Sequence, residues 1–179
     1  MELTLKQFDD ILSICKDVFY HKMKDYGSAW RILRPSSLTD QIYIKAQRIR
    51  SIDTKGKAKV NEGIKPEFIG IINYSIMALV QIEKADNANL SISMDEALNL
   101  YEKYAAEAKE LLENKNHDYG EAWRNMRVSS LTDIILMKLM RIKQIEDNAG
   151  KTFASEGVEA NYFDIINYAV FAMIKLNFE

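Results

Sequence analysis

The sequence has few residues of three kinds: one cysteine, two prolines and seven glycines in 179 residues. The lone cysteine, Cys15, excludes an internal disulfide, and the shortage of turn-forming residues argues against a fold of many short strands. No segment approaches the ~18 uninterrupted apolar residues that a membrane-spanning helix needs. The first residues, MELTLKQFDD, lack the basic and then apolar regions of a secretory signal. We therefore expect a cytoplasmic protein with no membrane partner.

The chain also lacks a large excess of either sign of charge. The formal net charge is −2, which gives no reason to expect a nucleic-acid partner. The sign differs between the halves, since residues 1–90 hold 14 Lys and Arg against 11 Asp and Glu, and residues 91–179 hold 10 against 15. The resulting net charges of +3 and −5 favour halves that attract one another over a surface that binds a polyanion.

An internal repeat organises the chain. Residues 22–40 read KMKDYGSAWRILRPSSLTD and residues 115–133 read KNHDYGEAWRNMRVSSLTD. At an offset of 93, 17 of the 28 positions from Asp25 to Ile52 are identical in the two copies. After one inserted residue, EGIKPEFIGIINYSIMAL aligns with EGVEANYFDIINYAVFAM. Two copies are too few for an array of repeats, so duplication and fusion is the simpler explanation.

Each copy shows the spacing of amphipathic helices. Between Leu5 and Phe19, apolar residues recur at steps of three and four, which predicts a first long helix. We expect a third helix after Pro66 and after Ala160. Capping-box pairs predict where the first and second helices begin. These pairs are Thr4 with Gln7, Ser93 with Glu96, Ser37 with Asp40, and Ser130 with Asp133.

The predicted fold class is all-α, with two fused copies of a three-to-four-helix unit packed as a pseudo-two-fold helical bundle. Residues 1–84 form the first repeat, residues 85–93 a polar linker, and residues 94–179 the second repeat. One chain then imitates a symmetric dimer. We expect a monomeric pseudo-dimer or a homodimer of this chain.

Basic residues interrupt an apolar helix in each copy. The segment IILMKLMRI is apolar on nearly every side except at Lys138 and Arg141, and Lys45 and Arg48 hold the same positions in the first copy. Such a helix is normally buried, and a buried cation needs a partner. The cations either pair internally with carboxylates or face a cleft and bind phosphate. The candidate carboxylates are Glu62, Glu67, Glu156 and Asp164.

The third helix of each copy repeats IINY unchanged, which places Asn73 and Asn167 within an apolar segment. A buried amide must find hydrogen-bond partners. These amides either bridge two helices where the helices cross, or contact a ligand beside carboxylates that hold Mg²⁺, a cation that prefers oxygen ligands.

The acids of the third helices differ between the copies. The first copy has Glu67 and Gly70, whereas the second has Asn161 and Asp164 at the corresponding positions. Each copy has therefore lost one acid that the other kept. One composite site that uses acids from both copies and simple decay of a duplicated site both remain open.

The shared DYG sequence predicts the end of the first helix, with glycine available for a left-handed cap. The two tryptophans of the chain follow three residues later. One interpretation is a helix stop and an aromatic wedge under the next helix. The other is a stacking wall for a nucleobase, with arginines near its phosphate. The candidates are Tyr26, Trp30 and Arg31 in the first copy, and Tyr119, Trp123 and Arg124 in the second.

With these elements placed, both halves resemble the nucleotide-modification-associated domain 1 family, a helical family of bacteria and phages. The resemblance rests on DYGxAWR, SSLTD, KxxRI and IINY and covers residues 20–83 and 113–177. The helical layout is also similar to the all-α nucleoside-triphosphate pyrophosphatases of the MazG type. That resemblance implies Mg²⁺ held by acids on two neighbouring helices. This chain departs from the pattern, since Lys45 and Arg48 stand where an EExxE sequence is expected.

Two hypotheses of function follow. In the first, the protein binds a small nucleotide or phosphate ligand and, if catalytic, is a Mg²⁺-dependent pyrophosphohydrolase linked to nucleotide modification or clean-up. In the second, it is a non-catalytic helical interaction module whose charges pair internally. In the first hypothesis the metal ligands are Glu62, Glu67, Glu156 and Asp164. The residues that contact the nucleotide are Lys45, Arg48, Lys138, Arg141, Tyr26, Trp30, Arg31, Tyr119, Trp123, Arg124, Asn73 and Asn167.

Overall fold

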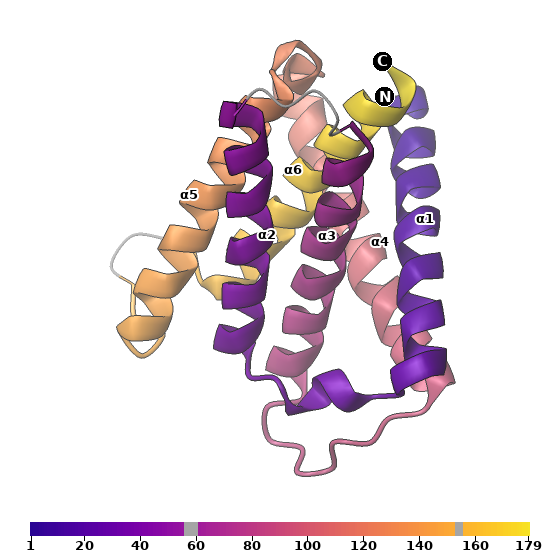
Figure 1. The fold of residues 1–179 in the computed structure, drawn as a ribbon, viewed down its shortest axis with the longest axis vertical. Helices are drawn as coiled ribbons and strands as arrows, with labels where there is room; N and C mark the ends of the chain where they lie inside the picture. The colour runs from indigo at the N-terminus through magenta and orange to yellow at the C-terminus, as the bar shows by residue number, and fades with distance from the viewer. Residues whose placement is uncertain (56–60, 153–155) are drawn as a thin grey trace.

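The protein is described from a computed structural model, which describes residues 1–55, 61–152 and 156–179, with the backbone alone at residues 61 and 62. These residues form six α-helices and two short 3₁₀-helices, with no strand among them (Figure 1). The first repeat consists of α1 (Glu2–Tyr26), η1 (Ala29–Ile32), α2 (Pro35–Lys55) and α3 (Asn61–Glu83). The second consists of α4 (Met94–Tyr119), η2 (Ala122–Asn125), α5 (Val128–Asp147) and α6 (Val158–Phe178). The predicted all-α class is confirmed.

The two repeats have the same order of elements. The 3₁₀-helices η1 and η2 begin 93 residues apart, and so do α2 and α5, which is the offset found in the sequence. In Figure 1, η1 lies at the lower end of the bundle and η2 at the upper end. The predicted linker at 85–93 falls between the end of α3 and the start of α4. The repeated helical bundle is therefore confirmed in structure as well as in sequence.

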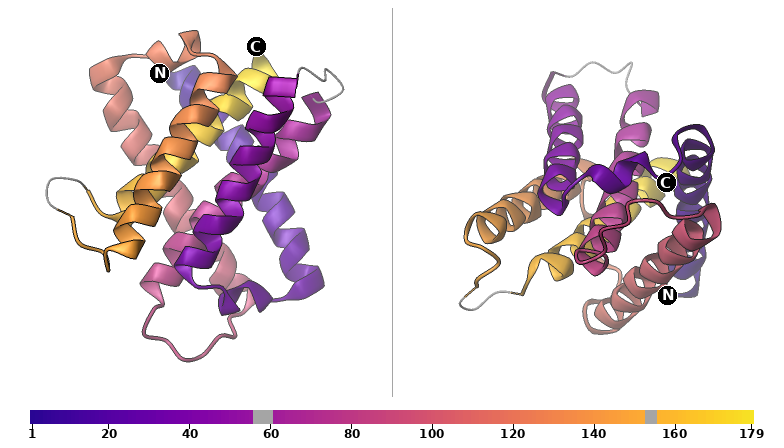
Figure 2. Two further views of the ribbon diagram at one scale, coloured as in Figure 1. Left: turned by 60° about the vertical axis from the view of Figure 1, so that its left-hand side comes forward. Right: turned by 90° about the horizontal axis from the view of Figure 1, so that it is seen from below.

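Helices α3 and α6 form the middle of the bundle. They pack against each other, α3 also packs against α2, and α6 also packs against α5. Helices α2 and α5 lie on one side of this pair and α1 and α4 on the other (Figure 2). Ile71, Ile72, Ile165 and Ile166 of the central pair have no exposed surface. Because burial of one such side chain stabilises the fold by about 1.5–3 kcal/mol, α3 and α6 anchor both repeats.

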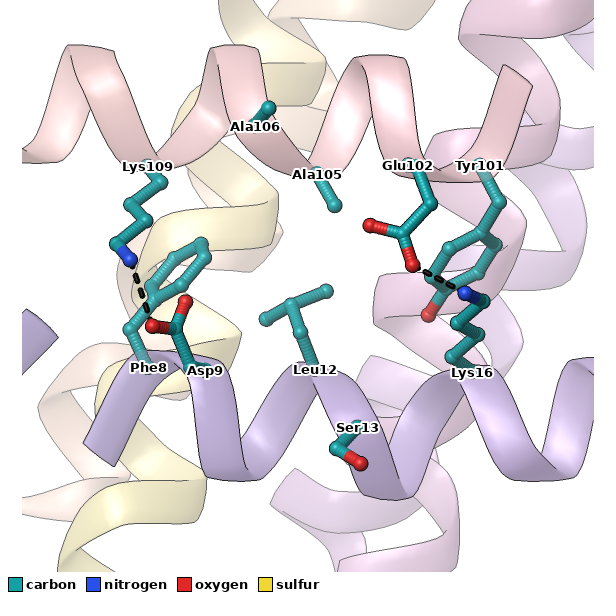
Figure 3. Close-up of a pocket in the computed structure, with 10 residues that line it drawn as sticks. All are labelled: Phe8, Asp9, Leu12, Ser13, Lys16, Tyr101, Glu102, Ala105, Ala106 and Lys109. Atoms are coloured by element: carbon teal, nitrogen blue, oxygen red, sulfur yellow. Dashed lines mark hydrogen bonds and ion pairs between the residues drawn. The ribbon is translucent and has the colours of Figure 1, made fainter. Parts of the chain in front are cut away.

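The pseudo-two-fold relation is visible where α1 faces α4. A groove of about 450 Å³ lies between them, with Phe8, Leu12 and Tyr101 among its lining residues (Figure 3). Two ion pairs cross the groove, and the offset of 93 converts the residues of one pair into those of the other. Lys109 pairs with Asp9 at 2.7 Å, and Lys16 pairs with Glu102. Both cations of this groove are therefore neutralised within the chain.

One predicted helix cap, Ser93, is confirmed, although the Glu96 side chain of the same predicted capping box pairs with Lys84 instead. The Ser93 hydroxyl at the start of α4 accepts a hydrogen bond from the backbone N–H of Glu96 at 3.1 Å. Helix α1 begins at Glu2, so the prediction that Thr4 caps it is wrong. The Thr4 hydroxyl is used elsewhere, because it donates to Glu121 and accepts from Arg124 in the second repeat.

The other predicted helix starts are also displaced toward the N-terminus. Helices α2 and α5 begin two residues before Ser37 and Ser130, which lie in the first turn rather than at the cap. Helix α3 begins before Pro66 instead of after it, and α6 begins two residues before Ala160. Proline at the first position of α2 explains one shift, since its fixed φ favours a helix start.

Glycine ends both first helices as predicted, although not in the left-handed helical conformation. Gly27 has φ 60° and ψ −144°, and Gly120 has φ 64° and ψ −156°. Positive φ with extended ψ is accessible to glycine and strained for other residues. Each glycine N–H still caps its helix, by donating at 2.8 Å to the carbonyl of Met23 or of Asn116.

Within the described residues, Gly63–Glu83 is one segment long and apolar enough to cross a membrane by length and composition alone. Of its most apolar stretch, 61% is buried inside the protein. This is the burial of a central helix in a packed bundle, and a core helix passes the same test of length and composition.

Candidate functional site

A pocket of about 650 Å³ opens in the first repeat, between α1, η1, α2 and α3. Pockets that hold small ligands usually measure about 300–1,000 Å³ and combine an apolar wall with a few polar groups. This pocket has that character. Its lining residues are Val18, Phe19, Lys22, Met23, Tyr26, Gly27, Trp30, Leu33, Lys45, Pro66, Ile69, Gly70, Asn73, Tyr74 and Met77.

The aromatic part of the wall comes from η1 and the end of α1. Trp30 is half-buried, and its indole Nε1 donates to the sulfur of Met23 at 3.2 Å. Phe19 meets the Trp30 ring edge-on, at 6.1 Å between centroids. Tyr26 is 73% exposed and lies at the rim. Indole is thus anchored by its nitrogen while part of its surface stays accessible.

Two lysines bring positive charge to this pocket. The Lys45 ammonium of α2 lies 3.5 Å from a Glu67 oxygen and 5.6 Å from the centroid of the Tyr74 ring. Lys22 of α1 is exposed, and no ion pair to it occurs within the described part of the chain. The Lys45 stem lies over Gly70, so close that an added Cβ there would meet its carbons at 2.6 Å. The first repeat therefore has a cationic group, Lys22, that no carboxylate neutralises among the residues that the structure describes.

Asn73 lines the pocket, but its amide is bonded within the protein. Its amide nitrogen donates to the carbonyl of Cys15 at 3.0 Å, and its oxygen accepts from the Tyr101 hydroxyl at 2.7 Å. Asn167 makes the equivalent bond in the second repeat, donating to the carbonyl of Ala108 at 3.1 Å. The interpretation that the IINY asparagines bridge helices agrees with both contacts. They join α3 to α1 and α6 to α4.

Arg48 does not line the pocket. It is exposed on α2 and donates to Glu67, whose other oxygen faces Lys45. Glu67 is 7% exposed, so this carboxylate is buried with a cation on each side. Of the two interpretations of the basic residues, internal pairing describes Arg48, whereas Lys45 shares its charge between Glu67 and the pocket.

The second repeat has an acid where the first has Gly70. The carboxylate of Asp164 accepts from Lys115 at 2.5 Å and from Lys138 at 2.8 Å. Burial would raise the pKa of Asp164, but the hydrogen bonds from the two lysines outweigh it and hold that pKa below its ordinary value. Burial would lower the pKa of Lys115, but the bond to Asp164 outweighs burial, and the pKa of Lys115 is raised above its ordinary value. Lys115 and Lys138 are the counterparts of Lys22 and Lys45, so here the chain supplies the anion.

The tryptophan of the second repeat is also covered. Trp123 is 5% exposed, and its ring stacks on Phe171 at 4.2 Å between centroids and 6° between planes. The residue at the position of Phe171 in the first repeat is Met77, which has no ring. The guanidinium of Arg124 lies 4.4 Å from the Trp123 centroid. Trp123 therefore behaves as the aromatic wedge of the packing interpretation.

The predicted arginines beside the tryptophans do not line the pocket. Arg31 is 3% exposed, donates to Gln81 and donates to the carbonyl of Asn89 at 3.2 Å. Gln81 in turn donates to the carbonyl of Arg31 at 2.8 Å. Arg31 thus holds the segment after α3 against η1, and the prediction that it lies near a ligand phosphate is not supported by this position.

Arg124 has the same internal character. It donates to Thr4 at 2.8 Å and to Gln7 at 2.9 Å, and it pairs with Glu121 and Glu179. The side chain therefore fastens both ends of the chain to η2. The remaining two predicted contact residues, Arg141 and Tyr119, are exposed, the tyrosine by 80%.

Of the four acids predicted to hold Mg²⁺, the three whose side chains are described do not form such a site. On α3, Glu67 faces Lys45 and Arg48 of α2. On α6, Asp164 faces two lysines of other helices, and Glu156 is exposed before the start of α6. The side chain of Glu62 lies outside the described residues. Among those that are described, no group of three acid, histidine or cysteine side chains is placed to bind a metal ion. A Mg²⁺ ion needs oxygen donors whose charge is not already neutralised.

Lys22 and Met77 are pocket residues that sequence reasoning missed. A signal existed for Lys22, because the repeated phrase begins with lysine in both copies, at residues 22 and 115. Met77 carried no signal on its own. Its meaning comes from Phe171 at the same position of the second repeat, and only the stacking contact makes that difference visible.

The sequence matches the family described as nucleotide modification associated domain 1 twice, over residues 22–82 and 115–176. The chain belongs to this family. It is a tandem pair of nucleotide modification associated domain 1 copies. Each match includes the tryptophan and the two corresponding lysines of its repeat. No curated protein and no solved structure matches the chain.

Proposed function

We propose that the protein binds a nucleotide in the pocket of the first repeat, with the base against Trp30 and the phosphate at Lys22 and Lys45. One observation carries this proposal. A pocket of suitable volume joins an indole wall to two lysines, and one of these lysines has no carboxylate partner within the described chain.

The chemistry of the pocket selects for a ligand with two unlike ends. Aromatic and apolar side chains favour a flat ring, because ring stacking adds to the burial of apolar surface. Ammonium groups favour phosphate oxygens, since hydrogen bonds between ions are stronger than neutral ones. A nucleotide carries both features in one molecule. The description of the family, which refers to nucleotide modification, fits this class of ligand.

The geometry favours binding over hydrolysis. The carboxylate that faces Lys45, Glu67, is already shared between Lys45 and Arg48, which leaves it poorly suited to hold a metal ion or activate water. The proposed function is therefore nucleotide binding in the cytoplasm, where nucleotides are abundant. Pyrophosphohydrolase activity is not part of it.

A thermal-shift panel tests the proposal directly. Ribo- and deoxyribonucleoside mono-, di- and triphosphates are added to the protein with and without Mg²⁺. A ligand that binds only the folded state raises Tm with its concentration. We expect at least one nucleotide to do so, and calorimetry then gives its Kd. If no member of the panel at millimolar concentration changes Tm, the proposal is wrong.

Two neighbouring lysines provide a matched pair of variants. Lys22→Ala removes a pocket cation and is expected to weaken nucleotide binding about tenfold, which corresponds to the loss of one charged hydrogen bond. Lys24→Ala removes an equal charge two residues away, from a side chain that lies 5.5 Å from the Tyr20 ring and outside the pocket. It should leave the Kd unchanged. Equal effects of the two substitutions would indicate non-specific attraction.

A second candidate function, a non-catalytic interaction module, is favoured by the second repeat. There Asp164 neutralises the lysines and the Phe171 ring covers the tryptophan, as expected for a scaffold whose charges pair internally. This candidate predicts that no nucleotide binds in either repeat. The panel above separates the two functions.

A further inference from the structure

Of the fifteen residues that line the pocket of the first repeat, seven are identical at the corresponding positions of the second repeat and eight differ. Lys22, Trp30 and Lys45 correspond to Lys115, Trp123 and Lys138. Among the eight are two positions on the third helix whose side chains in the second repeat contact these lysines and this tryptophan. Gly70 becomes Asp164, and Met77 becomes Phe171.

Each of these two side chains, Asp164 and Phe171, fills part of the second site. The Asp164 carboxylate lies between the two lysines, where the first repeat has only the hydrogen of Gly70. The Phe171 ring lies parallel to the Trp123 indole, where the first repeat has a methionine. A carboxylate and a flat ring thus occupy the two ends of the second site, which are the ends where the first repeat has accessible lysines and indole.

We infer that Asp164 and Phe171 stand in for the anion and the ring of the nucleotide, so that the chain binds one nucleotide, in the first repeat only. The inference rests on the proposed function and deepens it in two ways. Each chain then has one binding site. The side chains that fill the second repeat indicate which ligand groups the first repeat recognises.

The mimicry restricts the ligand. Asp164 and Phe171 are seven residues apart on α6, about two turns and ~10 Å along the helix axis. Gly70 and Met77 have the same separation on α3. A ligand that satisfies both ends must carry a planar ring and a negative group joined by a spacer. A nucleoside phosphate has this form, in which the sugar separates base from phosphate. A nucleoside alone or inorganic pyrophosphate satisfies one end only.

Exchange of the two positions between repeats is the decisive experiment. Gly70→Asp with Met77→Phe should close the first site. The new Cβ at residue 70 would displace only the flexible stem of Lys45, which can then pair with the carboxylate as Lys138 does with Asp164. Asp164→Gly with Phe171→Met should open the second site. Calorimetry with the tightest nucleotide of the panel measures the number of sites.

We expect one site in the wild-type protein, none in the closed variant and two in the opened variant. The nucleoside that corresponds to this nucleotide, and inorganic pyrophosphate, should each bind the wild-type protein at least tenfold more weakly than the nucleotide does. Two wild-type sites, full binding by the closed variant, or a single site in a folded opened variant would overturn the inference while leaving nucleotide binding intact. No binding to the wild-type protein would instead refute the proposed function.

Tryptophan fluorescence gives a second measurement that does not need the opened variant to fold. The chain has two tryptophans, one in each repeat. A base that stacks on Trp30 should quench its emission. Trp123→Phe should therefore keep the nucleotide-dependent quenching of the wild-type protein, and Trp30→Phe should lose it. Quenching that follows Trp123 would place the ligand in the second repeat and contradict the inference.

Discussion

The first and second repeats present the same lysines and tryptophans in opposite states. In the second, Asp164 neutralises two lysines and Phe171 covers the indole. In the first, Gly70 and Met77 at those positions leave a pocket of about 650 Å³. Two of the side chains that differ between the repeats, both on the third helix, thus fill space in the second repeat that is open in the first. Residues that are identical in the two copies of a duplicated site therefore indicate its function only once their contacts are known.

The largest expected difference between the repeats concerns the residues at positions 77 and 171. Phe171→Ala removes a buried ring and its stacking partner, and we expect it to lower the free energy of unfolding by about 4 kcal/mol. Met77→Ala removes a side chain that already borders open space, and about 2 kcal/mol is expected. Urea denaturation of both variants measures the difference. Equal losses would show that the second repeat is no better packed than the first.

A smaller difference is expected at the paired lysines. Lys138→Met leaves Asp164 with Lys115 alone, so the free energy of unfolding should fall by about 2 kcal/mol, less than for a buried acid left with no partner. Lys45→Met leaves the buried Glu67 with Arg48 and should cost less, about 1 kcal/mol, because Lys45 is more exposed than Lys138 and lies 3.5 Å from its acid, against 2.8 Å for Lys138.

Arg141→Gln is the control for Lys138→Met, because Arg141 is exposed on the same helix. Its expected effect on unfolding is within about 0.5 kcal/mol. Chemical denaturation at constant pH provides all three values. A loss of stability at Lys45 as large as that at Lys138 would contradict the contrast between an open and a closed site.

The smallest effect is on the acid dependence of stability. The Asp164 pKa is lowered in the folded protein by its two lysines, against the effect of burial. The unfolded chain therefore binds this proton more tightly, so the carboxylate stabilises the fold above about pH 4. That stabilisation is lost as pH falls through the folded-state pKa. Asp164→Asn should consequently lose less stability than the wild-type protein between pH 7 and pH 3.

Gly70→Asn supplies the matched control in the first repeat. It introduces the same amide without removing a carboxylate, so its unfolding free energy should change with pH as that of the wild-type protein does. Denaturant midpoints at several pH values between 3 and 7 compare the three proteins. Parallel curves for Asp164→Asn and the wild-type protein would show that this ion pair does not contribute to acid sensitivity.

Much of the fold could be predicted because its signals are local or repeated. Apolar spacing and the offset of 93 identified the helices and the duplication, and the scarcity of glycine and proline excluded many short strands. Helix starts were less accessible. The Thr4 hydroxyl is taken by Glu121 and Arg124, residues more than a hundred positions away, so a local capping rule failed there.

The candidate site was predictable in part. Tyr26, Trp30, Lys45 and Asn73 were chosen from the sequence, and all four line the pocket. Arg31 was chosen by the same reasoning but binds Gln81, 50 residues along the chain. Repetition marks a residue as important without distinguishing a ligand contact from an internal one, because both require the same polar group.

The sequence by itself determined that the chain is helical, duplicated and built around an apolar third helix in each copy. Periodicity and identity are properties of the order of residues, and they carry this information directly. Only the tertiary structure decided which lysines and which tryptophan are already satisfied. That outcome depends on whether a carboxylate and a ring from the third helix reach groups on the first and second helices, and packing alone brings those segments together.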